Sequence, residues 1–257
     1  MNTGAISSYF DVAQVTLYVF WFFFAGLIIY LRKEDQREGY PLVFDRVTAQ
    51  SPDDFPSMPS PKEFRMVNGE VRYAPRPEPR ETIAAVQGSY PGSPYEPTGN
   101  PMIDGIGPAA WANRSDEPDC AFDDQLPKIV PLRAAADFYL ATEDVDPRGF
   151  TVVGADGVEA GTIVDAWVDR SEVILRYLEI ERSGAGGSGR VLLPIGFVDT
   201  RAKTRQVRVS AILGSQFADV PVLRRPDCVS LREEDRIAGY YAGGTLYATP
   251  ERMEPFL

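Results

Sequence analysis

The sequence predicts a single transmembrane α-helix followed by a β-rich cytoplasmic domain, built as a small antiparallel β-barrel with a short C-terminal helix. Three observations predict this fold class. Residues 12–31 contain no charged side chain. Residues 1–11 carry no Lys or Arg, whereas Arg32, Lys33 and Arg37 follow the apolar stretch. After Lys128, β-branched runs alternate with turn residues at a spacing of about ten residues, which is typical of small barrels and sandwiches.

The uncharged stretch 12–31 is long enough to cross a bilayer, because about 20 helical residues span the ~30 Å hydrocarbon core. Tyr9 and Phe10 at one end and Tyr30 and Tyr40 at the other predict an aromatic belt. A signal peptide is disfavoured because a basic leader and a small-residue cleavage site are both missing. A buried core helix is disfavoured because the stretch is apolar on every face. The cations that follow it predict a periplasmic tail over 1–11 and a cytoplasmic bulk.

The proline content of residues 32–115 predicts an extended segment that lies along the membrane surface. Twelve prolines lie between Pro41 and Pro101, and proline suits neither a helix interior nor a central strand. Within this segment, residues 63–74 predict a short hairpin whose turn is Asn68-Gly69.

We expect the β-barrel domain and its C-terminal helix over residues 116–257. The expected strands cover 138–142, 150–154, 160–169, 172–181, 189–195 and 205–212. Asp156-Gly157 and the glycine-rich stretch 184–189 are typical of hairpin turns. Ser230 and Glu233 form a capping box that opens a short helix, which we expect to end near Gly243-Gly244.

The composition excludes several classes of function. The formal net charge of -11 argues against a nucleic-acid partner, which needs a basic surface. Histidine is absent, so a Ser-His-Asp triad, a Cys-His dyad, an HExxH zinc site and imidazole ligation of a pigment are all excluded. Cys120 and Cys228 lie far apart and are expected to be reduced, partly buried thiols. Residues 184–189 match GxGxxG, but a strand containing Pro194 follows, so dinucleotide binding is not expected.

An acidic run occupies residues 116–124. It consists of Asp116, Glu117, Asp119, Asp123 and Asp124, with no basic residue between them. The run predicts either a solvated loop or a proton-collecting mouth, in which clustered carboxylates attract cations and raise one another's pKa.

A second acidic group lies between two predicted strands. Asp169 and Glu172 occupy the expected hairpin, and Arg176 follows Glu172 by four residues. A carboxylate at the edge of an apolar core has its pKa raised towards neutrality, which a proton relay needs. The alternative is a turn with an exposed Glu–Arg pair of little energetic value.

Five segments together resemble a known family: 20–42, 99–114, 164–172, 176–181 and 233–248. Their motifs include EGYPL after the apolar stretch and GNPMIDGIGPAAW. In order and spacing they resemble the H subunit of the purple-bacterial photosynthetic reaction centre, a PRC-barrel protein. The segment 43–98 is similar only loosely.

The resemblance implies a non-catalytic subunit of a light-driven electron-transfer complex in the photosynthetic inner membrane. It implies a cap on the cytoplasmic side of the L and M subunits, with light-harvesting antenna and membrane lipids nearby. Those partner subunits would carry the bacteriochlorophyll, bacteriopheophytin, quinones and non-haem iron, so that this chain binds no cofactor itself. The cap would stabilise the complex and help conduct protons to the secondary quinone.

By position, the resemblance assigns proton transfer to Asp169 and Glu172, with Arg176 beside them. Members of this family carry histidines at the proton entrance, where this sequence has Asp123, Asp124 and Gln125. Either Asp123 and Asp124 take over the entry of protons, or the entry lies elsewhere. Two other functions remain open from the residues: a membrane-tethered PRC-barrel adaptor without proton transfer, and a membrane-anchored enzyme, which the lack of histidine disfavours.

Overall fold

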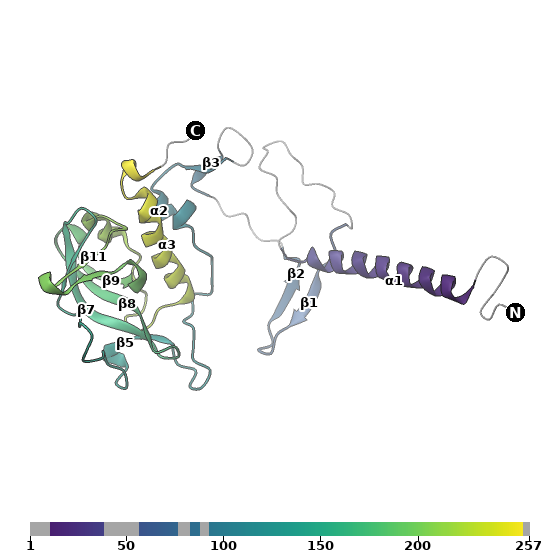
Figure 1. The fold of residues 1–257 in the computed structure, drawn as a ribbon, viewed down its shortest axis with the longest axis horizontal. Helices are drawn as coiled ribbons and strands as arrows, with labels where there is room; N and C mark the ends of the chain where they lie inside the picture. The colour runs from purple at the N-terminus through teal and green to yellow at the C-terminus, as the bar shows by residue number, and fades with distance from the viewer. Residues whose placement is uncertain (1–10, 39–56, 77–82, 88–92, 254–257) are drawn as a thin grey trace. The chain divides into compact units, whose positions relative to one another are not determined.

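The computed structural model describes residues 11–38, 57–76, 83–87 and 93–253. The chain divides into two compact units (Figure 1), which are described separately. The first unit comprises residues 1–82 and 89–93, and the second comprises 83–88 and 94–257. Residues 1–10 of the predicted tail, with Tyr9 and Phe10, lie outside the described residues, as does Tyr40. The predicted division at residues 11, 31 and 115 stays a prediction.

Helix α1, Val12–Asp35, forms the long element of the first unit. The Asp11 side chain caps its N-terminus by accepting a hydrogen bond of 2.7 Å from the Gln14 amide. The helix continues four residues beyond the apolar stretch. This extension is favourable because Arg32 and Lys33 lie in the last turn, where the helix dipole stabilises positive charge.

None of the residues of α1 is buried. By length and composition, α1 is a candidate membrane span, as predicted. Some of its aromatic rings contact one another, as Phe20 does Trp21 and Phe24. Because the helix nevertheless buries none of its side chains, water would be a poor solvent for it.

A hairpin follows in the same unit, as Asn68-Gly69 predicts. Strands β1, Lys62–Arg65, and β2, Val71–Ala74, pair antiparallel, and Gly69 adopts a φ of 84° in the turn. The Arg37 side chain donates hydrogen bonds to the carbonyl oxygens of Ser60 and Ala74 at 2.8 and 2.9 Å. These bonds tie the hairpin to the end of α1.

The second unit contains the remaining helices and strands. The strands are β3 (Ala85–Gln87), β4 (Tyr95–Pro97), β5 (Ile129–Pro131), β6 (Thr151–Val153), β7 (Glu159–Asp169), β8 (Ile174–Arg182), β9 (Gly189–Pro194), β10 (Asp199–Arg201) and β11 (Gln206–Arg208). The helices are α2, Pro101–Asp104, and α3, Leu231–Tyr247. Short 3-10 helices occupy Gly107–Ala109, Leu132–Ala134, Gly184–Gly186, Ile195–Phe197, Ala202–Thr204, Gly214–Asp219 and Pro250–Arg252. β3 and β4 form a separate two-stranded sheet.

The main sheet has seven strands in the order β10-β11-β6-β7-β8-β9, with β5 paired to β7. All pairings are antiparallel except that of β6 with β11, which is parallel. The central strand β7 pairs with β6 at its start and with β5 at its end, and its register with β8 shifts twice. Such bulges bend a strand, so β7 can serve two neighbours on one edge. Among the described residues the pairing path is open between β10 and β9.

The predicted turns at Asp156-Gly157 and 184–189 lie where expected, between β6 and β7 and between β8 and β9. The predicted strand over 138–142 is wrong, because these residues are irregular and Tyr139 is 84 % exposed. Phe138 and Leu140 are half-buried and Tyr139 is exposed, but no strand of the described residues pairs with this segment, and a β-strand needs such a partner. The short strand β10 was missed.

The core of the second unit lies between the sheet and α3 (Figure 1). Its fully buried side chains include Trp167, Leu178, Ile180, Leu192, Phe217, Ile237 and Tyr241. Ser230 and Glu233 form the predicted capping box at the start of α3. The two cysteines are free, as expected, with Cys120 half-buried and Cys228 buried.

The predicted end of the last helix at Gly243-Gly244 is wrong, because α3 continues to Tyr247. The two glycines instead allow α3 to pack closely against neighbouring segments. A Cβ added to Gly243 would lie 2.5 Å from the Ala109 Cβ, and one added to Gly244 would lie 2.6 Å from the Ala211 carbonyl oxygen. Glycine therefore lets α3 approach two backbone segments that a larger residue would push away.

Candidate functional site

The β7–β8 hairpin brings Asp169, Glu172 and Arg176 together. Asp169 is buried, and its Oδ1 accepts hydrogen bonds from the backbone amides of Ser171 and Glu172 at 2.9 and 3.0 Å. The Arg176 Nη2 lies 3.3 Å from Asp169 Oδ2 and 2.8 Å from Glu172 Oε2. One guanidinium thus bridges a buried carboxylate and an exposed one, and the tight turn fixes the buried carboxylate.

These three residues line a pocket of about 210 Å³. Its remaining walls come from the segment before β5 and from the start of α3. The full lining is Arg114, Asp119, Lys128, Ile129, Asp169, Ser171, Glu172, Arg176, Leu231 and Glu234. The pocket thus holds four carboxylates and three cations, and it is large enough for several water molecules.

Glu234, from the first turn of α3, is the half-buried carboxylate of this pocket. Its Oε2 accepts a hydrogen bond of 3.0 Å from the Tyr177 hydroxyl on β8. Burial raises the pKa of Glu234 above its ordinary value, although the Tyr177 bond and the charges of Arg114 and Arg176 oppose this shift. A carboxyl with a raised pKa takes up and releases a proton closer to neutral pH than an exposed one does.

Asp119 and Lys128 also line this pocket. The Lys128 Nζ lies 2.8 Å from Asp119 Oδ2, and this bond raises the pKa of Lys128. The nearby charges of Asp169 and Glu172 raise it further. Lys128 therefore remains a cation, which offsets the repulsion among the pocket's carboxylates.

The structure does not bring Asp123 and Asp124 into this pocket. They lie exposed in the loop that an isolated bridge between Cys120 and Pro127 closes. Asp124 pairs with Arg170, which follows Asp169 in the β7–β8 hairpin, and this bond lowers the pKa of Asp124.

The acidic run is consequently less repulsive than its sequence suggests. Asp116 accepts a hydrogen bond from Ser230 and pairs with Arg224 at 2.8 Å, and the Ser230 bond is the main reason that its pKa is lowered. Glu117 pairs with Arg225 at 3.2 Å. The expectation that neighbouring carboxylates raise the pKa values is wrong for Asp116 and Asp124, because hydrogen bonds from residues distant in sequence, Ser230 and Arg170, lower them.

Comparison with known families assigns both parts of the chain. Residues 4–134 match the family described as the photosynthetic reaction centre H-chain N-terminal region. The chain belongs to the photosynthetic reaction centre H-chain family. Residues 142–213 of this H-chain match the PRC-barrel domain and contain β6 to β11. Membership of the family makes this H-chain a subunit of a photosynthetic reaction centre.

Two carboxylates of the H-chain pocket, Asp119 and Glu234, were not assigned to this site from the sequence. Glu234 is adjacent to the capping residue Glu233, and this position gives no sign that its side chain meets Tyr177. Asp119 belongs to the acidic run, but its partner Lys128 lies beyond a loop. Local sequence therefore identified the carboxylates of the hairpin and of the acidic run, but not that Asp119 shares a pocket with the hairpin.

Proposed function

We propose that this H-chain caps the L and M subunits on the cytoplasmic side and conducts protons through the Asp169–Glu234 pocket towards the secondary quinone. The observation that carries the proposal is the pocket itself. Four carboxylates line its volume of about 210 Å³, which has room for several water molecules. Glu172 is the most accessible of the acids on the hairpin, with 59 % of its side chain exposed, whereas Asp169 and Glu234 lie deeper.

The roles of the residues follow from their environments. Glu172 exchanges protons with water at the pocket. Glu234, whose pKa burial raises, holds a proton for longer before it passes on. Asp169 stays tied to Arg176 and to two amides, so it orients the turn and stabilises positive charge as a proton passes.

A quinone that receives two electrons in a buried site needs protons, because an unpaired charge there is costly. A cap of this kind keeps bulk water out while carboxylates and water carry the protons. We assign the bacteriochlorophyll, bacteriopheophytin, quinones and non-haem iron to the partner subunits, in keeping with a chain that has no histidine.

We also propose the orientation and surroundings of the chain. The N-terminus faces the periplasm, α1 spans the inner photosynthetic membrane among lipids and near the antenna, and the second unit lies in the cytoplasm. The support is the position of Arg32, Lys33 and Arg37 after the apolar stretch.

Replacing Glu172 tests the proton route. Glu172→Gln keeps an acceptor for Arg176 but cannot carry a proton, so we expect proton-coupled reduction of the secondary quinone to slow about tenfold or more. Primary charge separation should be unchanged. Flash-induced absorption changes, together with proton uptake by a pH-sensitive dye, measure both steps in the purified complex.

The matched control is Glu181→Gln, which alters an exposed glutamate on β8 that pairs with Arg190 outside the pocket. It should leave both steps unchanged. If Glu172→Gln transfers the second electron and its proton at the native rate, Glu172 has no part in the route.

A further inference from the structure

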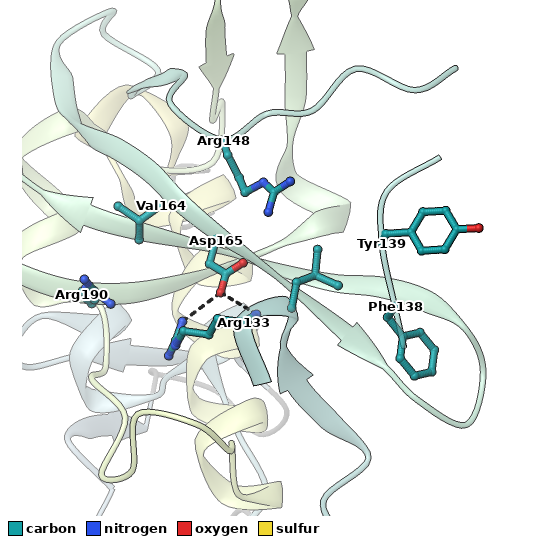
Figure 2. Close-up of a pocket in the computed structure, with 8 residues that line it drawn as sticks. Arg133, Phe138, Tyr139, Arg148, Val164, Asp165 and Arg190 are labelled. Carbon is teal, nitrogen blue, oxygen red and sulfur yellow. Dashed lines mark hydrogen bonds and ion pairs between the residues drawn. The ribbon is translucent and has the colours of Figure 1, made fainter. Parts of the chain in front are cut away.

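Glu234 differs from the buried carboxylates of the second unit in the group that donates a hydrogen bond to it. Each buried carboxylate in the described part of the chain forms an ion pair with a guanidinium. The pairs include those of Asp165 with Arg133, Asp169 with Arg176, and Glu179 with Arg190. Figure 2 shows the first of them, in which Arg133 binds Asp165 through its backbone amide and its guanidinium. Glu234 has no ion pair among the described residues, and its one donor is the neutral hydroxyl of Tyr177.

Tyr177 lies in β8, between two neighbouring strands of the main sheet. It is paired with Trp167 on β7 and with Pro194 on β9. Its side chain is buried, and its hydroxyl reaches Glu234 Oε2 on α3 at 3.0 Å. Burial raises the pKa of Tyr177 above its ordinary value, and the charge of Glu234 raises it further. The hydroxyl therefore stays protonated, and Tyr177 remains a hydrogen-bond donor.

The Tyr177 bond makes the two oxygens of Glu234 unequal. Oε2 accepts the hydroxyl hydrogen, whereas Oε1 has no hydrogen-bond partner in the residues that the structure describes. A proton on Oε2 would force the Tyr177 hydroxyl to accept instead, and the hydrogen of that hydroxyl would then lack an acceptor. Because a buried donor without an acceptor is costly, a proton taken up by Glu234 is favoured on Oε1. Glu234 lines the Asp169–Glu234 pocket, so Oε1 is the oxygen left for water in the pocket.

We propose that Tyr177 is a positioning residue, which keeps the exchangeable proton of Glu234 on Oε1, where water in the Asp169–Glu234 pocket can reach it. This inference rests on the function proposed above and deepens it by assigning the proton to one atom. The O–H bond at Oε1 forms with a proton from that water and breaks when the proton passes back to water. The O–H bond of Tyr177 stays intact throughout, so the tyrosine itself carries no proton along the route.

Charged groups on several other segments also surround this carboxyl. The ionisable side chains that line the pocket with Glu234 are Arg114, Asp119, Lys128, Asp169, Glu172 and Arg176. On α3 itself, Asp235 pairs with Arg114. Burial is the largest influence on the pKa of Glu234 and raises it, and the Tyr177 bond is the largest of the influences that lower it. Removing only the Tyr177 hydroxyl leaves all of these charges in place.

Tyr177→Phe tests the inference, because it keeps the ring and removes the hydroxyl. Infrared spectra of the purified complex across a pH titration identify the C=O band of protonated Glu234 as the band that Glu234→Gln lacks. With the proton on Oε1, Oε2 is the carbonyl oxygen, and in Tyr177→Phe it loses its hydrogen bond. The band should therefore move to higher frequency. The pKa at which the band disappears should rise by about 0.5–1 pH unit, because a bond that lowers the pKa of Glu234 is gone.

Tyr240→Phe is the matched control. Tyr240 is also buried, and its hydroxyl donates at 2.7 Å to the Gln216 carbonyl oxygen, outside the pocket. This variant should leave the frequency and the pKa of the Glu234 band unchanged. The absorption spectrum of the pigments shows that each variant complex is assembled. An unmoved band in Tyr177→Phe, or an equal movement in Tyr240→Phe, would overturn the proposal.

Fluorinated tyrosine gives a second test that leaves the sequence unchanged. The hydroxyl of 3-fluorotyrosine is a stronger donor than that of tyrosine, so a complex from cells supplied with it should show the Glu234 band at lower frequency. A band at the native frequency would contradict the proposal. The result is separate from the proton route: if Glu234→Gln takes up protons at the native rate, the route loses Glu234, whereas the C=O band still reports which oxygen holds its proton.

Discussion

Glu234 shows how packing against a distant segment changes the proton affinity of one carboxyl. Both carboxylate oxygens of the adjacent Glu233 accept hydrogen bonds from backbone amides, those of Arg224 and Ser230. Glu234 points instead towards β8, where burial raises its pKa and Tyr177 donates to it. The difference between the two residues comes from what packs against each, because both lie in the first turn of the same helix.

The raised pKa predicts a pH-dependent stability. The folded chain holds the Glu234 proton more tightly than the unfolded chain does. The free energy of unfolding therefore falls as the pH rises from 4.5, the ordinary pKa of Glu, through the raised pKa of Glu234, and the loss remains at higher pH. Glu234→Gln keeps an acceptor for Tyr177 and removes the buried charge. The variant should therefore melt at a higher temperature than the native chain at about pH 8 and at the same temperature near about pH 4.

Thermal unfolding of the full chain in detergent, followed by circular dichroism across this range, measures the effect. Glu181→Gln, an exposed substitution on β8, should show no such trend. A constant difference between Glu234→Gln and the native chain at all pH values would mean that Glu234 titrates alike in the folded and unfolded chains.

At the scale of elements, α3 depends on its glycines for close packing against the segments beside it. Gly244 approaches the backbone at Ala211, and the Arg252 Nη1 donates to the carbonyl oxygens of both residues at 2.8 Å. The close contact and the shared hydrogen bonds hold the end of α3 on the segment that follows β11. Glycine lowers the helix propensity, and the packing compensates for this loss.

Gly244→Ala should destabilise the second unit by about 1–3 kcal/mol, because the new methyl group would lie 2.6 Å from a backbone oxygen that cannot rotate away. We expect the melting temperature of the full chain to fall by about 2–4 °C for each kcal/mol. The control is Gly196→Ala, where nothing lies within 4 Å of the added Cβ. A Gly244→Ala chain as stable as the control would show that α3 moves away without loss.

For the whole molecule, the distribution of charge along the chain supports the proposed orientation. All 26 Lys and Arg residues follow residue 31, and none lies within or before the apolar stretch. α1 exposes apolar side chains all round, which suits lipid and partner helices rather than water.

The proposed orientation has a simple test, because trypsin cuts only after Lys and Arg. In closed vesicles whose cytoplasmic face is outward, trypsin should degrade the chain, whereas in intact spheroplasts the chain should survive. Spheroplasts permeabilised with detergent are the control and should lose it. Digestion in intact spheroplasts would reverse the proposed orientation.

The sequence alone was enough to predict the features that neighbouring residues decide. The apolar stretch predicted α1, Asn68-Gly69 predicted the first hairpin, and the capping box predicted the start of α3. The same holds for the contact of Arg176 with Asp169 and Glu172, because a hairpin keeps nearby residues together. Local patterns failed at the supposed strand over 138–142.

Only the tertiary structure decided which distant residues meet. It placed Glu234 and Asp119 beside the β7–β8 hairpin, gave Asp116 and Asp124 their arginine partners, and carried α3 through Gly244 to Tyr247. Proton affinity depends on burial and on charges within a few ångströms, and both are set by packing between segments far apart in the chain. For this reason the sequence named candidate acids, whereas the fold determined which of them share a pocket.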